Sequence, residues 1–396
     1  MYLCKMKRFL SIFAIALILC ILLSSSKSGY IPKSGPTATV VGALSTEMNG
    51  TSTLFYWNDR LWTCEDHGKL ILFALDSLTG EEVDRITLPV RVNDMEEVAQ
   101  DADYLYFGDF GNNVDNQRDN LRILRCLKSD LAEGACHFDT VRFTYPDYQP
   151  GPGGDAMTTD FDCEAMIATE DSLYLFTKQW GSFKTACYSL PKEPGDYIAA
   201  PHGLLDVGGL VSGACYLPEK HLLVLCGYNS VVQPFVYLLY GFEGTDFFGG
   251  EKSKVSLSNG IGTQTEGIAS LDGEHYFLTN EYFDGLGIRP AQLLALDLSE
   301  YLHDYLYPDT TQTAISEAGA SIVSLYPNPT TGKVRVSDIG GMMLRGCQVE
   351  AYDMRGSRVG ESRDGVLDLS AQADGVYLVS IIAPDGSRTT TTVVKQ

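Results

Sequence analysis

The sequence has few basic residues for its size. Its 396 residues include 29 Lys and Arg against 51 Asp and Glu, which gives a formal net charge of −22. A charge of this sign repels phosphate backbones and anionic lipid and attracts cations. We therefore expect no nucleic-acid partner. With 44% hydrophobic residues, the chain is still apolar enough to form two globular domains, so full disorder is excluded.

Long hydrophobic runs are also scarce. The one extended run, residues 10–23, has fourteen residues, whereas a membrane-spanning helix needs about 20. The run follows Lys5, Lys7 and Arg8 and precedes a Ser-rich segment, which is the pattern of a secretory signal peptide that ends near Ser26. We predict that residues 1–26 are this signal peptide and that the mature chain has no transmembrane span.

Local catalytic motifs are missing. The sequence contains no G-x-S-x-G nucleophile elbow and no P-loop, and none of its six histidines pairs with another at a zinc-like spacing. A site assembled from separate strands leaves no such motif, so an enzyme is not excluded. From the residues alone, the choice between an enzyme and a binding protein stays open.

What the sequence does contain is a repeated hairpin. Five segments begin at Ser52, Glu96, Glu164, Gly213 and Glu266, and each has an apolar or aromatic residue ten positions later, at Trp62, Tyr106, Tyr174, Leu223 and Tyr276. A further alternating stretch, which reads as a third strand, follows each hairpin. This repeat predicts an all-β fold, a β-propeller over residues 37–306. It has five blades, or six if another lies within residues 136–160, and a β-sandwich is the alternative.

The strand at residues 37–44 has no partner before it in the sequence. Since a propeller is a closed ring of blades, this strand is expected to complete the last blade.

The repeat register predicts a site at one mouth of the propeller channel. The first strand of a blade is innermost, and antiparallel partners keep a constant sum of residue numbers. The expected pairs are Ser52 with Glu65, Glu96 with Asp109, Glu164 with Thr177, Gly213 with Cys226, and Glu266 with Thr279. Together with residues two positions earlier, they gather the candidate metal ligands Asp94, Glu96, Asp109, Asp162, Glu164 and Glu266 at that mouth.

These carboxylates would repel one another, which requires raised pKa values or a bound cation. Oxygen ligands without a converging histidine or thiolate favour Ca²⁺ or Mg²⁺ over zinc. In the alternative interpretation, the acids cap strand ends, accept hydrogen bonds from backbone N–H groups or face solvent.

Cysteines offer one candidate disulfide. Cys126 and Cys136 flank a short segment symmetrically, so a chain that turns back between them brings the two together across two outer strands. The alternative for this pair, and the expectation for Cys64, Cys163, Cys187 and Cys347, is a free buried thiol.

The repeats resemble a bacterial family of exported propellers of uncharacterised activity. The family signatures SGLA, DWEDIA, DIGDN, EAL and GEAI correspond here to STLF, DMEEVA, DFGNN, CEAM and TEGIA, over roughly residues 45–300. The family is distantly similar to calcium-dependent phytase-like and gluconolactonase-like propellers. The resemblance therefore implies a divalent-cation-dependent hydrolase of phosphoesters or lactones as one hypothesis. The other is a surface module that binds a ligand or glycan without chemistry.

The C-terminal segment carries its own ordered motifs. After a polar linker at 307–320, residues 321–396 alternate as short strands with a Pro-Asn-Pro turn, which predicts a small β-sandwich. The segment closely resembles the type A C-terminal sorting domain of the type IX secretion system of Bacteroidetes. The matching residues include Tyr326, Pro327, Asn328, Pro329, Gly375, Tyr377 and Lys395. The resemblance implies Sec export, then binding of the tail by the type IX machinery, and a protein that is anchored on the outer-membrane surface or released.

Overall fold

The computed structural model describes residues 35–114, 117–150, 157–285, 288–308, 323–338, 348–353, 357–363, 365–382 and 388–396. The predicted signal peptide and nearly all of the predicted linker lie outside these residues. The chain divides into two compact units, Met1–Ala295 and Leu296–Gln396. Within the described ranges, no helix is both long and apolar enough to cross a membrane.

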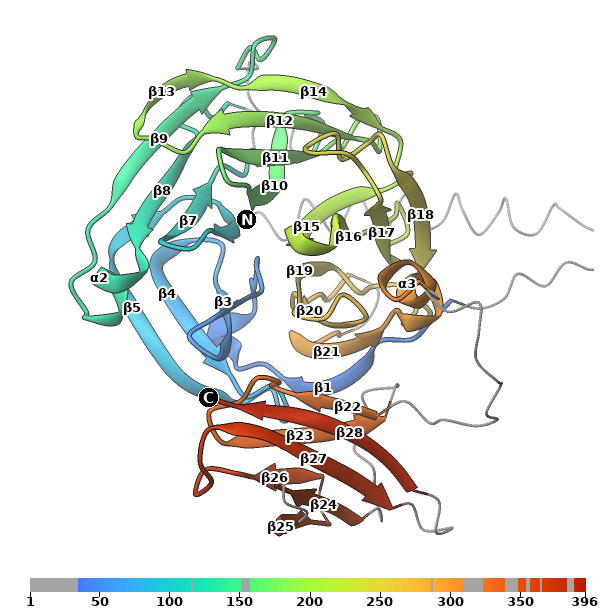
Figure 1. Cartoon of the computed structure of the whole chain (residues 1–396). Helices are drawn as coiled ribbons and strands as arrows, with labels where there is room; N and C mark the ends of the chain where they lie inside the picture. Colours follow the sequence, from blue (N-terminus) through green and yellow to red (C-terminus); the bar gives the residue numbers. More distant parts are fainter. Residues whose placement is uncertain are drawn as a thin grey trace, which may run out of the picture. The chain divides into compact units, whose positions relative to one another are not determined.

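The first unit is a ring of five sheets, which we number as blades 1 to 5 (Figure 1). Blade 1 contains β2 (Phe55–Trp57), β3 (Arg60–Cys64), β4 (Gly68–Leu75) and β5 (Glu82–Val92). Blade 2 contains β6 (Met95–Gln100), β7 (Tyr104–Asp109), β8 (Arg122–Leu127) and β9 (Asp139–Thr144). Blade 3 contains β10 (Asp162–Ala168), β11 (Ser172–Lys178), β12 (Thr185–Pro191) and β14 (Ala200–Leu205).

Blade 4 contains β15 (Leu210–Leu217), β16 (Leu222–Tyr228), β17 (Pro234–Tyr240) and β18 (Glu251–Ser256). Blade 5 contains β19 (Thr265–Ser270), β20 (His275–Asn280), β21 (Gln292–Asp297) and β1 (Thr39–Ala43). The short helices are η1 (Thr46–Met48), α2 (Lys128–Ala132), η2 (Pro218–Lys220) and α3 (Ser299–Leu306).

The ring closes through its first strand. β1 pairs antiparallel with β21, and Thr39 lies opposite Ala295. The prediction that residues 37–44 complete the last blade is confirmed, and so is the five-bladed propeller. Residues 136–160 supply β9 of blade 2 and, as far as they are described, no sixth blade.

One further strand ties two neighbouring blades together. β13 (Gly195–Ile198) lies in the connection between β12 and β14 of blade 3, but it pairs in parallel with β9 of blade 2. Next to it, the Lys192 ammonium lies 2.6 Å from Asp101 of blade 2. Blade 2 therefore has five strands instead of the four expected from the repeat.

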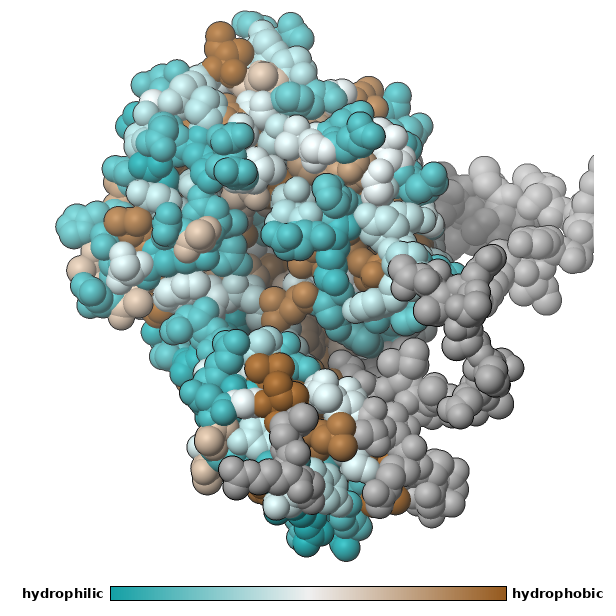
Figure 2. Space-filling model, viewed as in Figure 1, coloured by the Kyte–Doolittle hydropathy of each residue, from teal (hydrophilic) through white to brown (hydrophobic). Residues whose placement is uncertain are grey.

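The core of the propeller lies between adjacent blades. Because side chains alternate along a strand, each blade presents one apolar row to each neighbour. Trp62 and Leu72 of blade 1, for example, share a buried cluster with Val98 and Phe107 of blade 2. The face seen in Figure 2 is mostly hydrophilic, with scattered hydrophobic residues. The structure joins Cys126 to Cys136 in a disulfide, with Cα atoms 6.4 Å apart. Cys64, Cys163 and Cys187 are buried free thiols, and Cys347 lies outside the described residues.

The second unit contains a small β-sandwich. One sheet contains β22 (Val323–Tyr326), β23 (Lys333–Asp338) and β26 (Val366–Asp368). The other contains β25 (Arg358–Ser362), β24 (Gln348–Tyr352), β27 (Gly375–Ile382) and β28 (Arg388–Lys395). Val336, Leu367, Val379 and Val393 share one buried apolar cluster drawn from both sheets, as the alternating pattern predicts.

Candidate functional site

The innermost strands share a β-bulge at one register position. In blade 2, Met95 pairs with Asp109 and Glu97 pairs with Gly108, so Glu96 is the extra residue. The corresponding extra residues in blades 3, 4 and 5 are Glu164, Ser212 and Glu266. A bulged residue leaves the ladder and its side chain is re-aimed. In blade 1 the corresponding residue is Ser52, which follows the bridge between Thr51 and Glu65.

Because of the bulge, the observed strand pairing differs from most of the predicted register. The pair Gly213 with Cys226 is confirmed. The other four predicted pairs are wrong by one residue, because the strand contains an extra residue that a constant sum of residue numbers does not include. Thr177, for example, lies opposite Cys163 and not opposite Glu164. In blade 4, the residue equivalent to the acids is Ser212, one position before the predicted Gly213.

Four of the predicted acids gather at one end of the channel with a lysine. We call Asp94, Glu96, Glu164, Glu266 and Lys178 the mouth cluster. The exposed fractions of Glu96, Glu164 and Glu266 are only 6%, 2% and 4%. A Cβ atom on Gly111 would clash with both Asp94 Oδ2 and Glu96 Oε1. These two oxygens are therefore close neighbours, next to a backbone position that has no side chain.

Lys178 is the residue that the sequence analysis missed. It ends β11, lies opposite Asp162 and is 3% exposed. Its Nζ atom is 3.1 Å from Glu164 Oε1 and 4.0 Å from Glu266 Oε2. The same atom lies 5.1 Å from the ring centres of Trp180 and of Tyr228, at cation–π distance. A lone charge at the end of the apolar strand SLYLFTK was the available signal.

Burial is the main cause of raised pKa values in the mouth cluster. It raises the pKa of Asp94 and of Glu266 to about 7, against the opposing effects of Arg118 and Lys178. The pKa of Glu96 is well above its usual value because of burial and the nearby charge of Glu164. At neutral pH these carboxyl groups are therefore less ionised than exposed ones, and a bound cation would favour their charged form.

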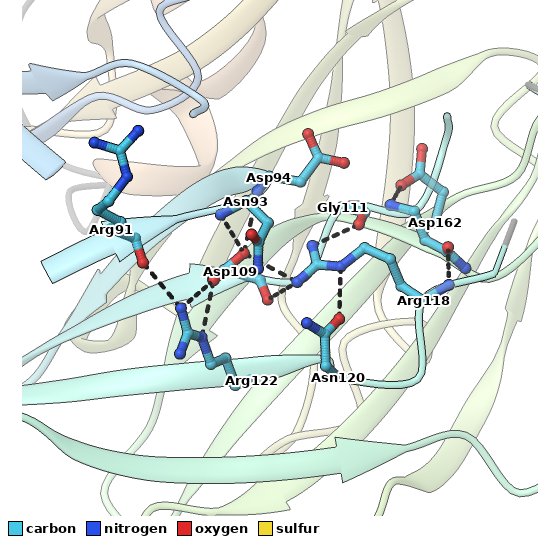
Figure 3. Close-up of polar contacts among 10 residues, drawn as sticks. Arg91, Asn93, Asp94, Asp109, Gly111, Arg118, Asn120, Arg122 and Asp162 are labelled. Carbon is cyan, nitrogen blue, oxygen red and sulfur yellow. Dashed lines mark hydrogen bonds and ion pairs between the residues drawn. The ribbon is translucent and has the colours of Figure 1, made fainter. Parts of the chain in front are cut away.

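Two other predicted ligands are already occupied by protein donors. Asp109 accepts hydrogen bonds from the backbone N–H groups of Asn93 and Asp94, and it forms ion pairs with Arg118 at 3.0 Å and Arg122 at 2.8 Å. Figure 3 shows this network, with the carboxyl group of Asp94 pointing away from it. Asp109 therefore fixes the backbone that carries Asp94.

Asp162 is held in a similar way. Its Oδ1 atom accepts a hydrogen bond from the backbone N–H of Asn112 at 2.6 Å, and its Oδ2 atom accepts one from Trp180 Nε1 at 2.8 Å. These contacts match the structural role that the sequence analysis kept as the alternative for the acids.

Two oxygens at the bulge position have no hydrogen-bond partner among the described residues. They are Glu266 Oε2 in blade 5 and Ser52 Oγ in blade 1. Both side chains are buried, and their blades are neighbours in the ring. Buried polar atoms are nearly always paired, so these two need an explanation.

A hydrogen bond crosses the channel one residue beyond the acids. Glu97 is 2% exposed, and its Oε2 atom accepts a hydrogen bond from the backbone N–H of Ala214 at 2.9 Å. Its Oε1 atom accepts bonds from Val98 N–H and from the hydroxyl of Thr53. Blades 2 and 4 are not neighbours, so this side chain links strands on different sides of the channel.

A second group of potential ligands lies between β3 and β4. Ligand atoms of Glu65, Asp66 and His67 all lie within 4.8 Å of one another, the only such trio found among the described residues. The side chains of His67 and Asp66 are hydrogen-bonded, and Glu65 Oε1 accepts a bond from Gly50 N–H at 2.8 Å. The charge of Asp66 contributes to the raised pKa values of Asp94 and Glu266, which links this trio to the mouth cluster.

The C-terminal unit has a clear family assignment. Residues 324–396 match the family model of the secretion system C-terminal sorting domain. This segment is a type IX sorting domain. It directs the chain to the type IX secretion machinery and hence to the cell surface or to secretion. The Asn328 side chain accepts a bond from Val394 N–H and donates one to the carbonyl of Thr392, which fixes the YPNP turn to β28.

The other motif residues of the sorting domain hold its C-terminal edge. Lys395 is 8% exposed, and its Nζ atom lies 2.9 Å from Asp374 Oδ1. The Tyr377 hydroxyl donates to the carbonyl of Ala373 at 2.5 Å. Gly375 begins β27 opposite Lys395.

No curated protein matches the sequence. Among solved structures, an aldose sugar dehydrogenase from Streptomyces coelicolor in its PQQ-bound form has 13% identity and a TM-score of 0.38, covering 67% of this chain and 99% of that one. A putative 6-phosphogluconolactonase from Bacteroides uniformis ATCC 8492 has 12% identity and a TM-score of 0.31, covering 93% and 88%. A GH43_1 enzyme from Xanthomonas citri has 12% identity and a TM-score of 0.37, covering 66% and 90%. Similarity at this level says nothing about activity.

Proposed function

We propose that this exported propeller is a binding protein whose channel mouth holds a divalent cation, Ca²⁺ or Mg²⁺. One observation carries the proposal: the mouth cluster holds four carboxyl groups but a single buried ammonium group, that of Lys178, which is paired with Glu164 and Glu266. Buried charges in proteins are paired or coordinate metal ions. Carboxylate oxygens are the ligands that these two cations prefer.

The ion fits best on the side of blades 2 and 3. There, Asp94 and Glu96 place two oxygens next to each other at Gly111. Glu164 is the strongest charged neighbour of Glu96, and its Oε1 atom lies 3.1 Å from Lys178 Nζ. We therefore assign Asp94, Glu96 and Glu164 as ligands. Asp109 and Asp162 act as supports, because protein donors already occupy their oxygens.

A calcium titration tests this assignment. The full exported chain, freed of metal with a chelator, should bind Ca²⁺ in isothermal calorimetry. At one hundred times the dissociation constant, binding stabilises a protein by about 2.7 kcal/mol, which raises the melting temperature by roughly 5–10 °C. Glu96→Gln and Glu164→Gln should each remove this shift. Glu243→Gln changes an exposed acid and should keep it. An unchanged melting temperature in the wild type would reject the proposal.

A divalent-cation-dependent hydrolase is the second candidate. It is favoured by the position of Lys178, since an ammonium group beside a bound ion can stabilise negative charge that develops on a phosphoester or lactone. Under this hypothesis, Lys178→Met keeps Ca²⁺ binding and loses turnover, whereas Glu96→Gln loses both. A panel of phosphoester and lactone substrates that gives no Ca²⁺-dependent turnover leaves the binding protein as the function.

A further inference from the structure

We infer that the channel mouth contains a binding site for an alkylammonium group and that the side chain of Lys178 is the built-in ligand of this site. We call the site the ammonium cage, and it is formed by Glu164, Glu266, Trp180 and Tyr228. The inference goes beyond the proposed function, because its ligand is an organic cation and not a metal ion.

The first argument is that the groups of the cage converge on one atom, Lys178 Nζ. Glu164 Oε1 lies 3.1 Å from this atom, and Glu266 Oε2 lies 4.0 Å from it. The ring centres of Trp180 and Tyr228 each lie 5.1 Å from the same atom. Aromatic rings within about 6 Å of an ammonium group attract it, and proteins recognise ammonium ligands in this way. The mouth therefore contains both carboxylates and aromatic rings around a single cation.

The second argument is that the cage is closed to water. The exposed fractions of Glu164, Tyr228 and Lys178 are 2%, 3% and 3%. Cation–π attraction is stronger in such a desolvated site. Burial opposes the charged form of Lys178, but the charges of Glu164 and Glu266 hold its pKa well above the usual value. The cage therefore keeps its resident ligand in the ammonium form.

The third argument is that contacts outside the cage hold its aromatic rings. Trp180 Nε1 donates a hydrogen bond to Asp162 Oδ2 at 2.8 Å. The Tyr228 hydroxyl accepts one from Gln264 Nε2 at 3.1 Å. Both rings also pack in one apolar cluster with Phe283. Because these contacts do not involve the lysine, the cage should keep its shape when the lysine is shortened, and a preorganised site binds its ligand at a lower entropic cost.

The experiment empties the cage and offers it a soluble ligand. Lys178→Ala removes Cγ, Cδ, Cε and Nζ, which together have the size and shape of n-propylammonium. Cavities made by truncation in a protein interior bind small molecules that match them. In the full exported chain, freed of metal with a chelator, n-propylammonium chloride should raise the melting temperature of Lys178→Ala by about 3–6 °C at ten times its dissociation constant.

Three controls accompany this titration. The wild type has its cage occupied, and Lys178→Met fills most of the same space without a charge, so n-propylammonium should shift neither melting temperature. 1-Propanol has the same shape without the charge and should not stabilise Lys178→Ala. No shift in Lys178→Ala, an equal shift in either control protein, or an equal shift with 1-propanol would each overturn the inference.

Variants of Tyr228 test the aromatic wall. Combined with Lys178→Ala, Tyr228→Leu removes the ring and should weaken n-propylammonium binding about five- to tenfold. Tyr228→Phe keeps the ring and loses only the hydroxyl, so it should weaken binding much less. Equal affinities in the two double variants would overturn the assignment of this ring to the cage.

A measurement on the chain with Lys178 in place decides the question if Lys178→Ala does not fold. With ¹³C at the lysine Cε atoms, the Lys178 signal is assigned by its loss in Lys178→Arg. Its attached protons should resonate upfield of those of the other lysines, because they lie over two aromatic rings. Tyr228→Leu should reduce this displacement, whereas Tyr228→Phe should keep it. A Lys178 signal at the ordinary lysine position overturns the cage.

The calcium titration of the proposed function is a separate measurement, since the ammonium titrations are made in chelator. A chain that binds Ca²⁺ but shows no stabilisation of Lys178→Ala by n-propylammonium overturns this inference alone. A chain that shows the stabilisation but binds no Ca²⁺ supports the inference and rejects the proposed function.

Discussion

The carboxyl group of Glu97 and the backbone N–H of Ala214 lie 2.9 Å apart and join blades 2 and 4 across the propeller channel. Burial raises the pKa of Glu97 to about 8, although its three hydrogen-bond donors act in the opposite direction. The side chain that links these blades is therefore largely protonated at neutral pH, and its ionisation weakens the fold.

Replacement of Glu97 should flatten the pH dependence of stability. Between the ordinary pKa of a glutamate and about 8, the folded state holds a proton that the unfolded chain has lost. This stabilisation is complete below about pH 4.5. It decreases progressively as the pH rises and is lost once the pH has passed through about 8. Glu97→Gln resembles the protonated form. Its slope of unfolding free energy between pH 5 and 8 should be shallower by up to about 1.4 kcal/mol per pH unit. Urea unfolding at several pH values measures it, and an identical slope in both proteins would contradict the prediction.

Removal of the Lys178 charge should have opposite effects on the metal-free and calcium-bound proteins. Without its ammonium group, Glu164 and Glu266 lose their nearest cation, and breaking a buried ion pair destabilises a protein by about 3–5 kcal/mol. Lys178→Met also removes a positive charge that repels a divalent ion, so Ca²⁺ affinity should rise about tenfold, or ~1.4 kcal/mol. Thermal denaturation and calorimetry measure the two effects. A fall in affinity would mean that Lys178 helps to position the ligands.

A methyl group at Gly111 should weaken cation binding more than folding. Its Cβ would displace the neighbouring oxygens of Asp94 and Glu96, and the backbone angles of Gly111 are open to other residues. We expect Gly111→Ala to lower Ca²⁺ affinity at least about tenfold and stability by about 1–3 kcal/mol. Gly181→Ala on the loop after β11 is the control, since its Cβ would first meet Asp160 Oδ1 at 3.2 Å. Unchanged affinity in Gly111→Ala would exclude Asp94 and Glu96 as joint ligands.

In the sorting domain, variants of Lys395 and Asp374 can distinguish recognition of the lysine by the secretion machinery from its contribution to stability. If the secretion machinery binds the lysine, Lys395→Ala should abolish export, whereas Asp374→Ala frees the ammonium group and should keep it. Since Lys395 is nearly buried beside a largely exposed partner, each variant should lose only about 1 kcal/mol of stability. The measurement is the fraction of the protein that is secreted by a host with a type IX secretion system. Equal loss of export in both variants would indicate that the ion pair itself is required.

The fold was predictable because its signals are local. Alternating apolar residues, turns at regular intervals and the unpaired strand at 37–44 identify the blades and the ring closure. The site was predictable only in part. A bulge adds one residue without changing composition, so the extra positions of Glu96, Glu164 and Glu266 were not visible. Arg118 and Arg122, from the loop and strand after Asp109, form ion pairs with its carboxyl group. No spacing rule predicts these ion pairs.

Lys178 comes from a different blade than the acids of blades 2 and 5. It is the last residue of β11 and has no motif around it. Only the closed ring brings it near Glu266, so sequence patterns within one blade could not have identified it.

Blade 5 combines the first strand of the propeller with its last, since Thr39 pairs with Ala295. A chain that stops before Gln292 therefore leaves β1 without its partner, and the open ring exposes strand edges that favour aggregation. Closure of blade 5 therefore requires both the first and the last strand of the propeller. The ring can form only after the whole propeller segment is present, and the sorting domain follows its last strand in the chain.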